Sequence, residues 1–325
     1  MQENAQPPIP ESATLLAADP ELIRLAKRTP AMSLRPRALR LSRFVADRMQ
    51  RRVQGELASG VRKSDHIAGA SVEVRVYRPS ITEATSDDSL PVLVWMHGGG
   101  FVMGDHREDT TCSQFVSELG IAVVSVGYRL APEHPFPAAL NDLWTAITWL
   151  RSEGAAMGLD TERMAVGGSS AGGGLAAALA QRAHDDGIEI RGQILVYSML
   201  DDRTAVRTDF GRRDHKGWTN GSNYTGWSSY LGTEPGSPTA LPYAVPARRE
   251  DLAGLAPAWI GVGTLDVFLD EDRAYADRLR AAGVWCDLVI VDEAIHGFDI
   301  LAADAESSKA FFASQVSFLR DVLGA

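Results

Sequence analysis

MAVGGSSAGGG, the stretch at residues 164–174, decides the fold of this chain. Its apolar start is typical of a buried strand, and an alanine-rich run predicted to be helical follows at residues 176–180. Between them, Gly168-Ser169-Ser170-Ala171-Gly172 fits Gly-x-Ser-x-Gly, a sharp strand-to-helix turn that presents a serine at the carboxyl edge of a sheet. Glycines are needed two residues either side of Ser170, because larger side chains would collide with the neighbouring strand and helix. The stretch predicts a strand-turn-helix unit with Ser170 as a candidate nucleophile.

The same glycines admit a second interpretation, a dinucleotide-binding turn. Gly172-Gly173-Gly174 with Ala177 satisfies a relaxed Gly-x-Gly-x-x-Gly/Ala fingerprint. That fingerprint needs its first glycine close after the strand and an acidic residue about 20 positions later. Here four residues intervene, and Asp201 lies 29 positions after Gly172. A dinucleotide site is therefore the weaker alternative.

Short apolar runs alternate with helical stretches on both sides of this motif. Val72, Val74 and Val76 alternate as in a half-buried strand. Near-continuous apolar runs, typical of strands buried on both faces, occur at 92–95, 121–126, 164–166, 194–196, 259–262 and 288–291. Helical candidates lie near 109–119, 137–153, 173–184, 270–282 and 305–323. The alternation predicts an α/β fold with a mainly parallel central sheet flanked by helices.

Two other parts of the sequence are candidates for a cap over the strand ends. Asp19-Pro20-Glu21 predicts the start of a short helix that Pro30 ends, and apolar residues at three- and four-residue spacing over 41–53 predict a basic amphipathic helix. The interval 201–258 has no clear strand, and such long intervals are usually functional. We expect an N-terminal helical cap segment at 1–65 and a catalytic domain at 66–325, with a cap insertion around 201–245.

Composition and charge exclude several classes of protein. With 45% hydrophobic and 23% charged residues, the chain is predicted to be soluble and globular. Its net charge of −10 repels phosphate backbones, so no nucleic-acid partner is expected. The charge is uneven, because residues 24–63 carry a net +10 and the rest of the chain −20. The arginines of this basic segment are interpreted as facing solvent and the acidic body, with a lipid-facing helix as the alternative.

The cysteine content limits the chemistry that is expected of the chain, and the N-terminal sequence indicates its compartment. Cys112 and Cys286 lie far apart in the sequence, so we expect buried thiols and neither a disulfide framework nor a metal site. No metal or organic cofactor is predicted.

The first twenty residues lack a signal-peptide pattern, and no apolar run is long enough to span a bilayer. The sequence predicts no stable membrane insertion and a cytoplasmic location.

His97-Gly98-Gly99-Gly100 directly follows the predicted strand at 92–95. Acyl transfer generates a negatively charged tetrahedral oxygen, and three consecutive residues without side chains let backbone N–H groups approach it. A flexible turn is the simpler explanation, but this tetrapeptide at a strand end is much rarer than an ordinary turn pair. The motif favours an oxyanion hole.

A base and an orienting acid are expected after the nucleophile, in the order Ser, acid, His. His296 is the histidine that follows Ser170 beyond a predicted strand end. Asp266 follows the predicted strand at 259–262 and is the preferred acid. Asp270 is the fallback, because it is explained equally well as part of a helix start.

Together these features resemble the bacterial hormone-sensitive lipase family of α/β-hydrolases, also called family IV esterases. The resemblance covers the chain from about residue 70 onward, and it includes the segment Tyr128-Arg129-Leu130-Ala131-Pro132-Glu133 and the His296-Gly297-Phe298 triplet. It implies that Ser170 is the nucleophile, His296 the base and Asp266 the orienting acid. It also implies an oxyanion hole formed by the N–H groups of Gly98, Gly99 and Ala171, and a cap that includes the N-terminal helices.

The expected activity follows from these residues and from the resemblance. The family usually has Asp or Thr where this chain has Ser169, and often Pro where it has Val267, but neither difference removes a reacting group. In the family the histidine corresponding to His97 is structural. We expect a serine carboxylic ester hydrolase that acts on small to medium acyl esters through an acyl-enzyme, with no cofactor.

Two alternatives to this activity remain at the level of the sequence. An amidase or other acyl hydrolase would use the same three residues. A non-catalytic binding protein is less favoured, because the related plant gibberellin receptor lacks the base whereas His296 is present. The expected partner is a small-molecule ester, with a homodimer left open.

Overall fold

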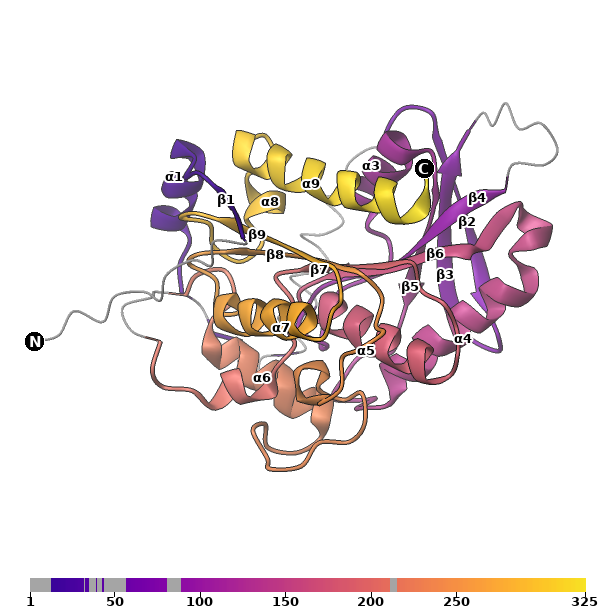
Figure 1. Ribbon diagram of the computed structural model, residues 1–325. Coiled ribbons are helices and arrows are strands. Elements are labelled where there is room, and N and C mark those ends of the chain that lie inside the picture. Colours follow the sequence, from indigo (N-terminus) through magenta and orange to yellow (C-terminus); the bar gives the residue numbers. More distant parts are fainter. Residues whose placement is uncertain are drawn as a thin grey trace, which may run out of the picture.

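The apolar runs predicted as strands lie side by side in one central sheet (Figure 1). A computed structural model describes residues 13–31, 33–34, 39, 43, 57–80, 89–210 and 215–325. Within these residues the sheet has nine strands, in the order β1-β9-β8-β7-β6-β4-β5-β3-β2. The strands are β1 (Thr14–Leu16), β2 (Val61–Ala68), β3 (Val72–Pro79), β4 (Leu90–Met96), β5 (Ala122–Gly127), β6 (Leu159–Ser169), β7 (Gly192–Val196), β8 (Ala258–Gly263) and β9 (Cys286–Val291).

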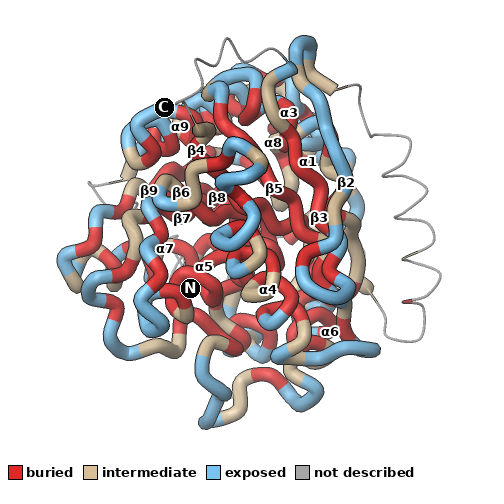
Figure 2. The backbone as a smooth tube through the Cα atoms, turned by 90° about the vertical axis from the view of Figure 1, so that its right-hand side faces the viewer, coloured by how far each residue is buried: buried red, intermediate tan, exposed pale blue. Residues whose placement is uncertain are grey.

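Most of this sheet is parallel, as predicted. The strands from β1 across to β5 pair in parallel, and β3 pairs antiparallel with both β5 and β2. The inner strands are covered on both faces, and their residues are buried, as Figure 2 shows. This double burial explains why these strands are near-continuous apolar runs in the sequence.

Two strands lie in the segment that the sequence assigned to the N-terminal cap. β1 is only three residues long, too short to show a pattern. β2 lies at the edge of the sheet, and its charged residues face water, so it carries no apolar run. The sheet therefore begins before residue 66. The assignment of residues 1–65 and 201–245 to a cap stays a prediction.

Helices cover both faces of the sheet, and the predicted helices that the structure describes are confirmed (Figure 1). One face carries α4 (Ala138–Glu153), α5 (Ala171–Asp185) and α7 (Leu269–Ala281). The other carries α1 (Pro20–Arg28), α3 (Asp109–Leu119), α8 (Phe298–Leu301) and α9 (Glu306–Leu323). At the start of α1, a carboxylate oxygen of Asp19 accepts a hydrogen bond from the Glu21 N–H at 2.7 Å, the expected cap.

The described part of the interval 201–258 contains no strand before β8, as predicted, but it does contain helices. These are η3 (Asp202–Val206), α6 (Asn220–Leu231) and η4 (Pro246–Arg248). The aromatic residues of this interval divide into two groups, since Trp227 and Tyr230 are buried whereas Trp218 is partly exposed. The basic helix predicted over 41–53 lies outside the described residues, apart from Arg43.

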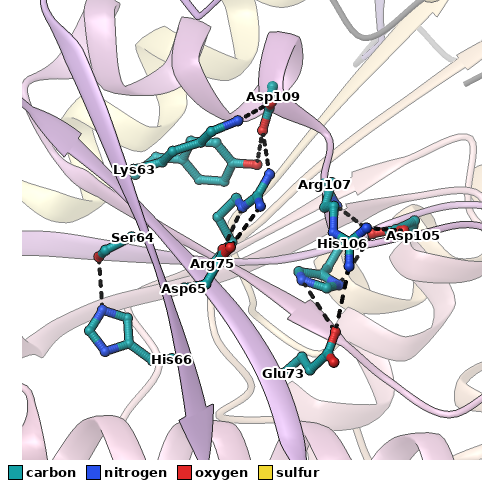
Figure 3. Close-up of polar contacts among 11 residues, drawn as sticks. Lys63, Ser64, Asp65, His66, Glu73, Arg75, Asp105, His106, Arg107 and Asp109 are labelled. Atoms are coloured by element: carbon teal, nitrogen blue, oxygen red, sulfur yellow. Dashed lines mark hydrogen bonds and ion pairs between the residues drawn. The ribbon is translucent and has the colours of Figure 1, made fainter. Parts of the chain in front are cut away.

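A partly buried ionic network fixes the start of α3 (Figure 3). The carboxylate of Asp109 accepts hydrogen bonds from Lys63 at 2.5 Å, Tyr77 at 2.7 Å and Arg75 at 3.1 Å. Burial disfavours the ionised form of Asp109, but these donors outweigh it, and the pKa of the carboxyl lies below its ordinary value. Because α3 directly follows the loop that begins at His97, the network anchors one end of that loop to β2 and β3.

Other expectations concern thiols, metals and membranes. Cys112 and Cys286 are free and buried, as predicted. Among the described residues, no cluster of His, Cys, Asp and Glu side chains is arranged to hold a metal ion. In the same part of the chain, no helix combines the length and hydropathy needed to cross a bilayer.

Candidate active site

Ser170 occupies a strained turn between β6 and α5. Its φ is 56° and its ψ −118°, a conformation that non-glycine residues rarely adopt. A Cβ on Gly168 would lie 2.4 Å from the Met96 carbonyl oxygen, and one on Gly172 would lie 2.0 Å from the same atom. The two glycines are therefore needed for the reason that the sequence suggested, because β4 leaves no room for side chains.

The turn brings Ser170 together with His296 and Asp266. The His296 Nε2 atom lies 3.1 Å from the Ser170 Oγ atom, and its Nδ1 atom lies 2.8 Å from the Asp266 Oδ2 atom. Asp266 is fully buried, and its Oδ1 atom accepts a hydrogen bond from the Phe268 N–H at 3.1 Å. The three side chains follow β6, β8 and β9, whose carboxyl ends meet at one edge of the sheet. Together they form a continuous chain of hydrogen bonds.

The fallback acid, Asp270, lies elsewhere. It is in the first turn of α7, and its Oδ2 atom accepts a hydrogen bond from Arg207 at 2.9 Å. Of the two candidate acids, Asp266 is the one in contact with His296.

Gly98 borders Ser170 just after the end of β4, and Gly99 follows it in the same loop. A Cβ on Gly98 would lie 3.1 Å from the Ser169 Oγ atom and 3.6 Å from the Ser170 Cβ atom. Gly99 has a φ of 113°, and a Cβ there would lie 2.1 Å from the Met103 carbonyl oxygen. Within the described residues, the N–H groups of Gly98 and Gly99 donate to no backbone carbonyl. Ala171 is the first residue of α5, where helix geometry also leaves the N–H group without an acceptor.

The buried side chain of His97 contacts the loop that contains Gly98 and Gly99. Its ring stacks on Tyr128 with centroids 4.2 Å apart, and its Nδ1 atom lies 2.7 Å from the Gly98 carbonyl oxygen. The Tyr128 hydroxyl donates to the His97 carbonyl at 2.7 Å. Burial lowers the pKa of His97 to about 4, so the ring is neutral at neutral pH. These contacts give His97 a structural place in the loop.

Three aromatic side chains surround the His296 ring. Tyr197 and Phe268 meet it edge-on, at centroid distances of 4.7 Å and 5.4 Å, and Trp218 lies at 6.3 Å. Trp218 also covers Gly100, since a Cβ there would lie 2.3 Å from the indole ring. The aromatic cluster in the sequence pointed to Trp218, but no sequence signal identified Tyr197, which simply ends an apolar run.

Glu108 is the residue at the N-terminal cap of α3. Its Oε2 atom accepts a hydrogen bond from the Trp95 indole at 2.7 Å. Loss of hydration raises the pKa of Glu108 to about 7 against the opposing effect of Trp95, and the nearby Asp299 and Asp105 add repulsion. The folded protein therefore favours the protonated form of Glu108.

This pKa predicts a pH-dependent effect of Glu108→Gln on stability. A raised carboxyl pKa contributes stability that is fully present below the unfolded value of 4.5 and is lost as pH rises through about 7. We expect the melting temperature of the variant, relative to wild type, to increase from pH 5 to pH 8 by roughly 5 °C, because a pKa raised from 4.5 to about 7 corresponds to about 2 to 3 kcal/mol over this range and each kcal/mol shifts a large domain by about 2 °C. Differential scanning fluorimetry at several pH values measures this difference in melting temperature. A difference that does not change with pH would contradict the raised pKa of Glu108.

Comparison with known proteins identifies the family of this chain. A family profile described as the α/β hydrolase fold matches residues 93–300. Esterase LipI of Mycobacterium tuberculosis is 39% identical over 234 residues, which are 70% of this chain and 71% of LipI. Carboxylesterase NlhH of the same organism is 35% identical over 241 residues, 70% of this chain and 71% of NlhH.

A solved structure and a receptor extend the comparison. The structure of a bacterial heroin esterase matches with a TM-score of 0.85 at 34% identity, covering 94% of this chain and 98% of the esterase. The gibberellin receptor of Oryza sativa is 34% identical over 272 residues, 74% of this chain and 76% of the receptor. The profile match, the esterase relatives and the shared fold agree: the chain belongs to the α/β-hydrolase fold family, among the family IV esterases, and is a carboxylesterase-type hydrolase.

Proposed function

We propose that Ser170 is the nucleophile of this carboxylesterase, His296 its general base and Asp266 the acid that orients His296. The observation that carries the proposal is the chain of hydrogen bonds Ser170–His296–Asp266, with distances of 3.1 Å and 2.8 Å. A base within hydrogen-bond reach of a hydroxyl, and itself held by a buried carboxylate, is the arrangement that nucleophilic acyl transfer needs.

Acylation begins when the Ser170 Oγ atom attacks the carbonyl carbon of the ester. As this bond forms, the hydroxyl proton passes to the His296 Nε2 atom, and the carbonyl electron pair moves onto oxygen. The tetrahedral intermediate then breaks its bond to the alcohol oxygen, which takes the proton back from His296. An acyl-Ser170 ester remains. Asp266 accepts a hydrogen bond from the Nδ1–H group throughout and stabilises the imidazolium.

Deacylation repeats these steps with water in place of Ser170. His296 takes a proton from the water as its oxygen attacks the acyl carbon, and collapse of the second intermediate returns this proton to the Ser170 Oγ atom. In both intermediates the oxyanion accepts hydrogen bonds from the N–H groups of Gly98, Gly99 and Ala171. Loss of one such donor typically costs about 10²- to 10³-fold in rate.

Matched esters and amides test the bond that is cleaved. We expect nitrophenyl acetate to be turned over, and the corresponding nitroanilide to react far more slowly, because its nitrogen is the poorer leaving group. Faster turnover of the anilide would identify an amidase. Tight binding of a small molecule with no turnover of either substrate would identify a binding protein.

The small to medium acyl range rests on Trp218, which lies against both Gly100 and His296. We expect Trp218→Ala to raise the ratio of kcat/KM for octanoyl over acetyl esters by about 10-fold or more, because each newly accommodated methylene contributes about 0.8 kcal/mol. A nitrophenyl ester series from acetyl to decanoyl measures this ratio.

Trp285→Ala is the matched control for this series. Trp285 is exposed and packs on Phe318, away from the described site. An unchanged length preference in Trp218→Ala, or an equal change in Trp285→Ala, would remove Trp218 from the substrate site.

Other features also remain proposals. The part of the N-terminal segment outside β1 and β2, together with the interval around α6, forms the cap. The charge pattern supports the absence of a nucleic-acid partner. Cytoplasmic residence and a homodimer are further proposals from the sequence. Sedimentation of the purified chain with and without DNA tests both the homodimer and the absence of a nucleic-acid partner.

A further inference from the structure

We propose that Arg43, from the N-terminal segment, is a positioning residue that holds the oxyanion-hole loop in its active shape. The inference rests on the proposed roles of Gly98 and Gly99, and it adds a residue on which those roles depend. Arg43 touches no reacting atom, so its effect on catalysis is transmitted through the loop.

The Arg43 guanidinium makes four hydrogen bonds to two separate segments. Its Nε atom donates to the Val102 carbonyl at 2.5 Å, and its Nη2 atom donates to the Ala131 carbonyl at 2.5 Å. Its two terminal nitrogens also bind the two carboxylate oxygens of Glu133, at 2.7 Å and 2.8 Å. A planar guanidinium can make this set of bonds, whereas a lysine ammonium cannot.

The Val102 carbonyl, which accepts a hydrogen bond from Arg43, belongs to the loop of the proposed oxyanion hole. The Gly99 carbonyl accepts hydrogen bonds from the N–H groups of Val102 and Met103, at 3.1 Å and 3.0 Å. Val102 is therefore in the same turn as Gly99, and Arg43 fixes the Val102 carbonyl on the other side. A shift of this carbonyl would move the turn and, with it, the Gly99 N–H group.

This turn needs support because its backbone is strained. Phe101 has a φ of 65°, which is unfavourable for a bulky side chain. The Phe101 ring stacks on Tyr230 of α6 at a centroid distance of 4.1 Å, and the Phe101 carbonyl accepts a hydrogen bond from the Ala131 N–H at 2.9 Å. Arg43 donates hydrogen bonds to both Val102 and Ala131, so the loop is held by Tyr230 of α6 and by Arg43.

The sequence did not predict this contact. The arginines of the basic segment were expected to face solvent and the acidic body, yet the Arg43 side chain is only 20% exposed and binds backbone carbonyls as well as Glu133. Glu133 belongs to the Tyr128–Glu133 segment on which the family resemblance rests in part. In the structure, the Glu133 carboxylate pairs with the Arg43 guanidinium and holds it against the loop.

The expected effect is on the transition state. Because small displacements of groups that bind the transition state cost up to about 10²-fold in rate, we expect kcat to fall about 10-fold in Arg43→Lys and about 100-fold in Arg43→Ala, with KM nearly unchanged. An aryl trifluoromethyl ketone, which forms a tetrahedral oxyanion with the nucleophilic serine, should lose affinity by the same factors. A purely structural role would lower the melting temperature but would leave kcat per titrated active site and the ketone Ki unchanged.

The experiment compares wild type, Arg43→Lys, Arg43→Ala, Glu133→Gln and the double variant Arg43→Ala/Glu133→Gln, with Arg28→Lys as the control. Arg28 is an exposed arginine of α1, in the same N-terminal region. Each variant is assayed for kcat, KM, ketone Ki and melting temperature. Glu133→Gln should show part of the loss seen in Arg43→Ala, and the double variant should lose no more than Arg43→Ala alone, since the two residues act as one unit.

The outcomes separate this inference from the proposed function. Wild-type kcat and ketone Ki in Arg43→Lys and Glu133→Gln, in an enzyme that hydrolyses esters, would overturn the role of Arg43 alone. If Arg43→Ala fails to fold, Arg43→Lys and Glu133→Gln still decide the question. A wild-type enzyme that hydrolyses nothing and forms no ketone adduct would instead overturn the proposed function.

Discussion

Ser170→Ala should reduce kcat for ester hydrolysis by about 10⁶-fold, the largest effect expected of any single change in this chain. The variant loses the only atom that forms the acyl-enzyme in the proposed mechanism. His296 and Asp266 then have no nucleophile to activate, and the remaining rate comes from the oxyanion hole and substrate binding alone. Initial rates with a nitrophenyl ester, together with labelling by a fluorophosphonate probe, measure the loss. Neither turnover nor labelling should be detected in the variant.

Ser169→Ala provides the matched control, because it makes the same change at the adjacent residue. Ser169 ends β6 and is buried, and its Oγ atom lies near Gly98, whereas the hydroxyl next to His296 Nε2 is that of Ser170. This variant should keep its labelling by the probe. If labelling is lost in Ser169→Ala and retained in Ser170→Ala, the nucleophile has been assigned to the wrong serine.

Asp266→Asn should reduce kcat by about 10⁴-fold. The Asp266 carboxylate accepts a hydrogen bond from His296 Nδ1, and this bond leaves the Nε2 atom free to take the proton of Ser170. An amide in this position can donate to Nδ1, which favours the wrong tautomer of the imidazole. The fold should survive, because asparagine has the same shape and can still accept the hydrogen bond from Phe268. Rates with the same nitrophenyl ester measure the effect.

Asp270→Asn makes the same change at the fallback position. Asp270 pairs with Arg207 in the first turn of α7, whereas the carboxylate bonded to His296 Nδ1 is that of Asp266. Its substitution should therefore leave kcat within about threefold of wild type, since a partly exposed ion pair contributes only about 1 kcal/mol or less. The reverse result, with a large loss in Asp270→Asn and a small one in Asp266→Asn, would assign the orienting acid to Asp270.

The sequence was most informative where the residues that determine a structural feature lie close together in the chain. The inner strands were visible because residues such as Val94, Val166 and Ile260 must be apolar on both faces of a parallel sheet. The turn at Ser170 was visible because Gly168 and Gly172 have no space for a side chain against Met96. The order Ser170, Asp266, His296 follows from strands whose carboxyl ends share one edge, and this order led to the contacts that the structure contains.

The sequence was less informative at the edges of the fold. β2 was missed because an exposed edge strand has no apolar run, and β1 because three residues are too few to form a pattern. α6 was missed because Gly221, Gly226 and several serines obscure its helical period. In each case the element is stabilised by neighbours that are distant along the chain, so its own residues carry a weak signal.

The sequence by itself determined the fold class, the glycine-lined turns and the three residues of the proposed triad, because each depends on residue types that are fixed by local geometry. Only the tertiary structure decided which residues surround those groups. Tyr197 meets the His296 ring edge-on, Trp218 covers Gly100, and Arg43 binds Val102 and Glu133, a residue 90 positions away. Contacts of this kind leave no periodic trace in the chain, since they arise from the shape of the folded sheet and its loops and from no pattern within any one segment.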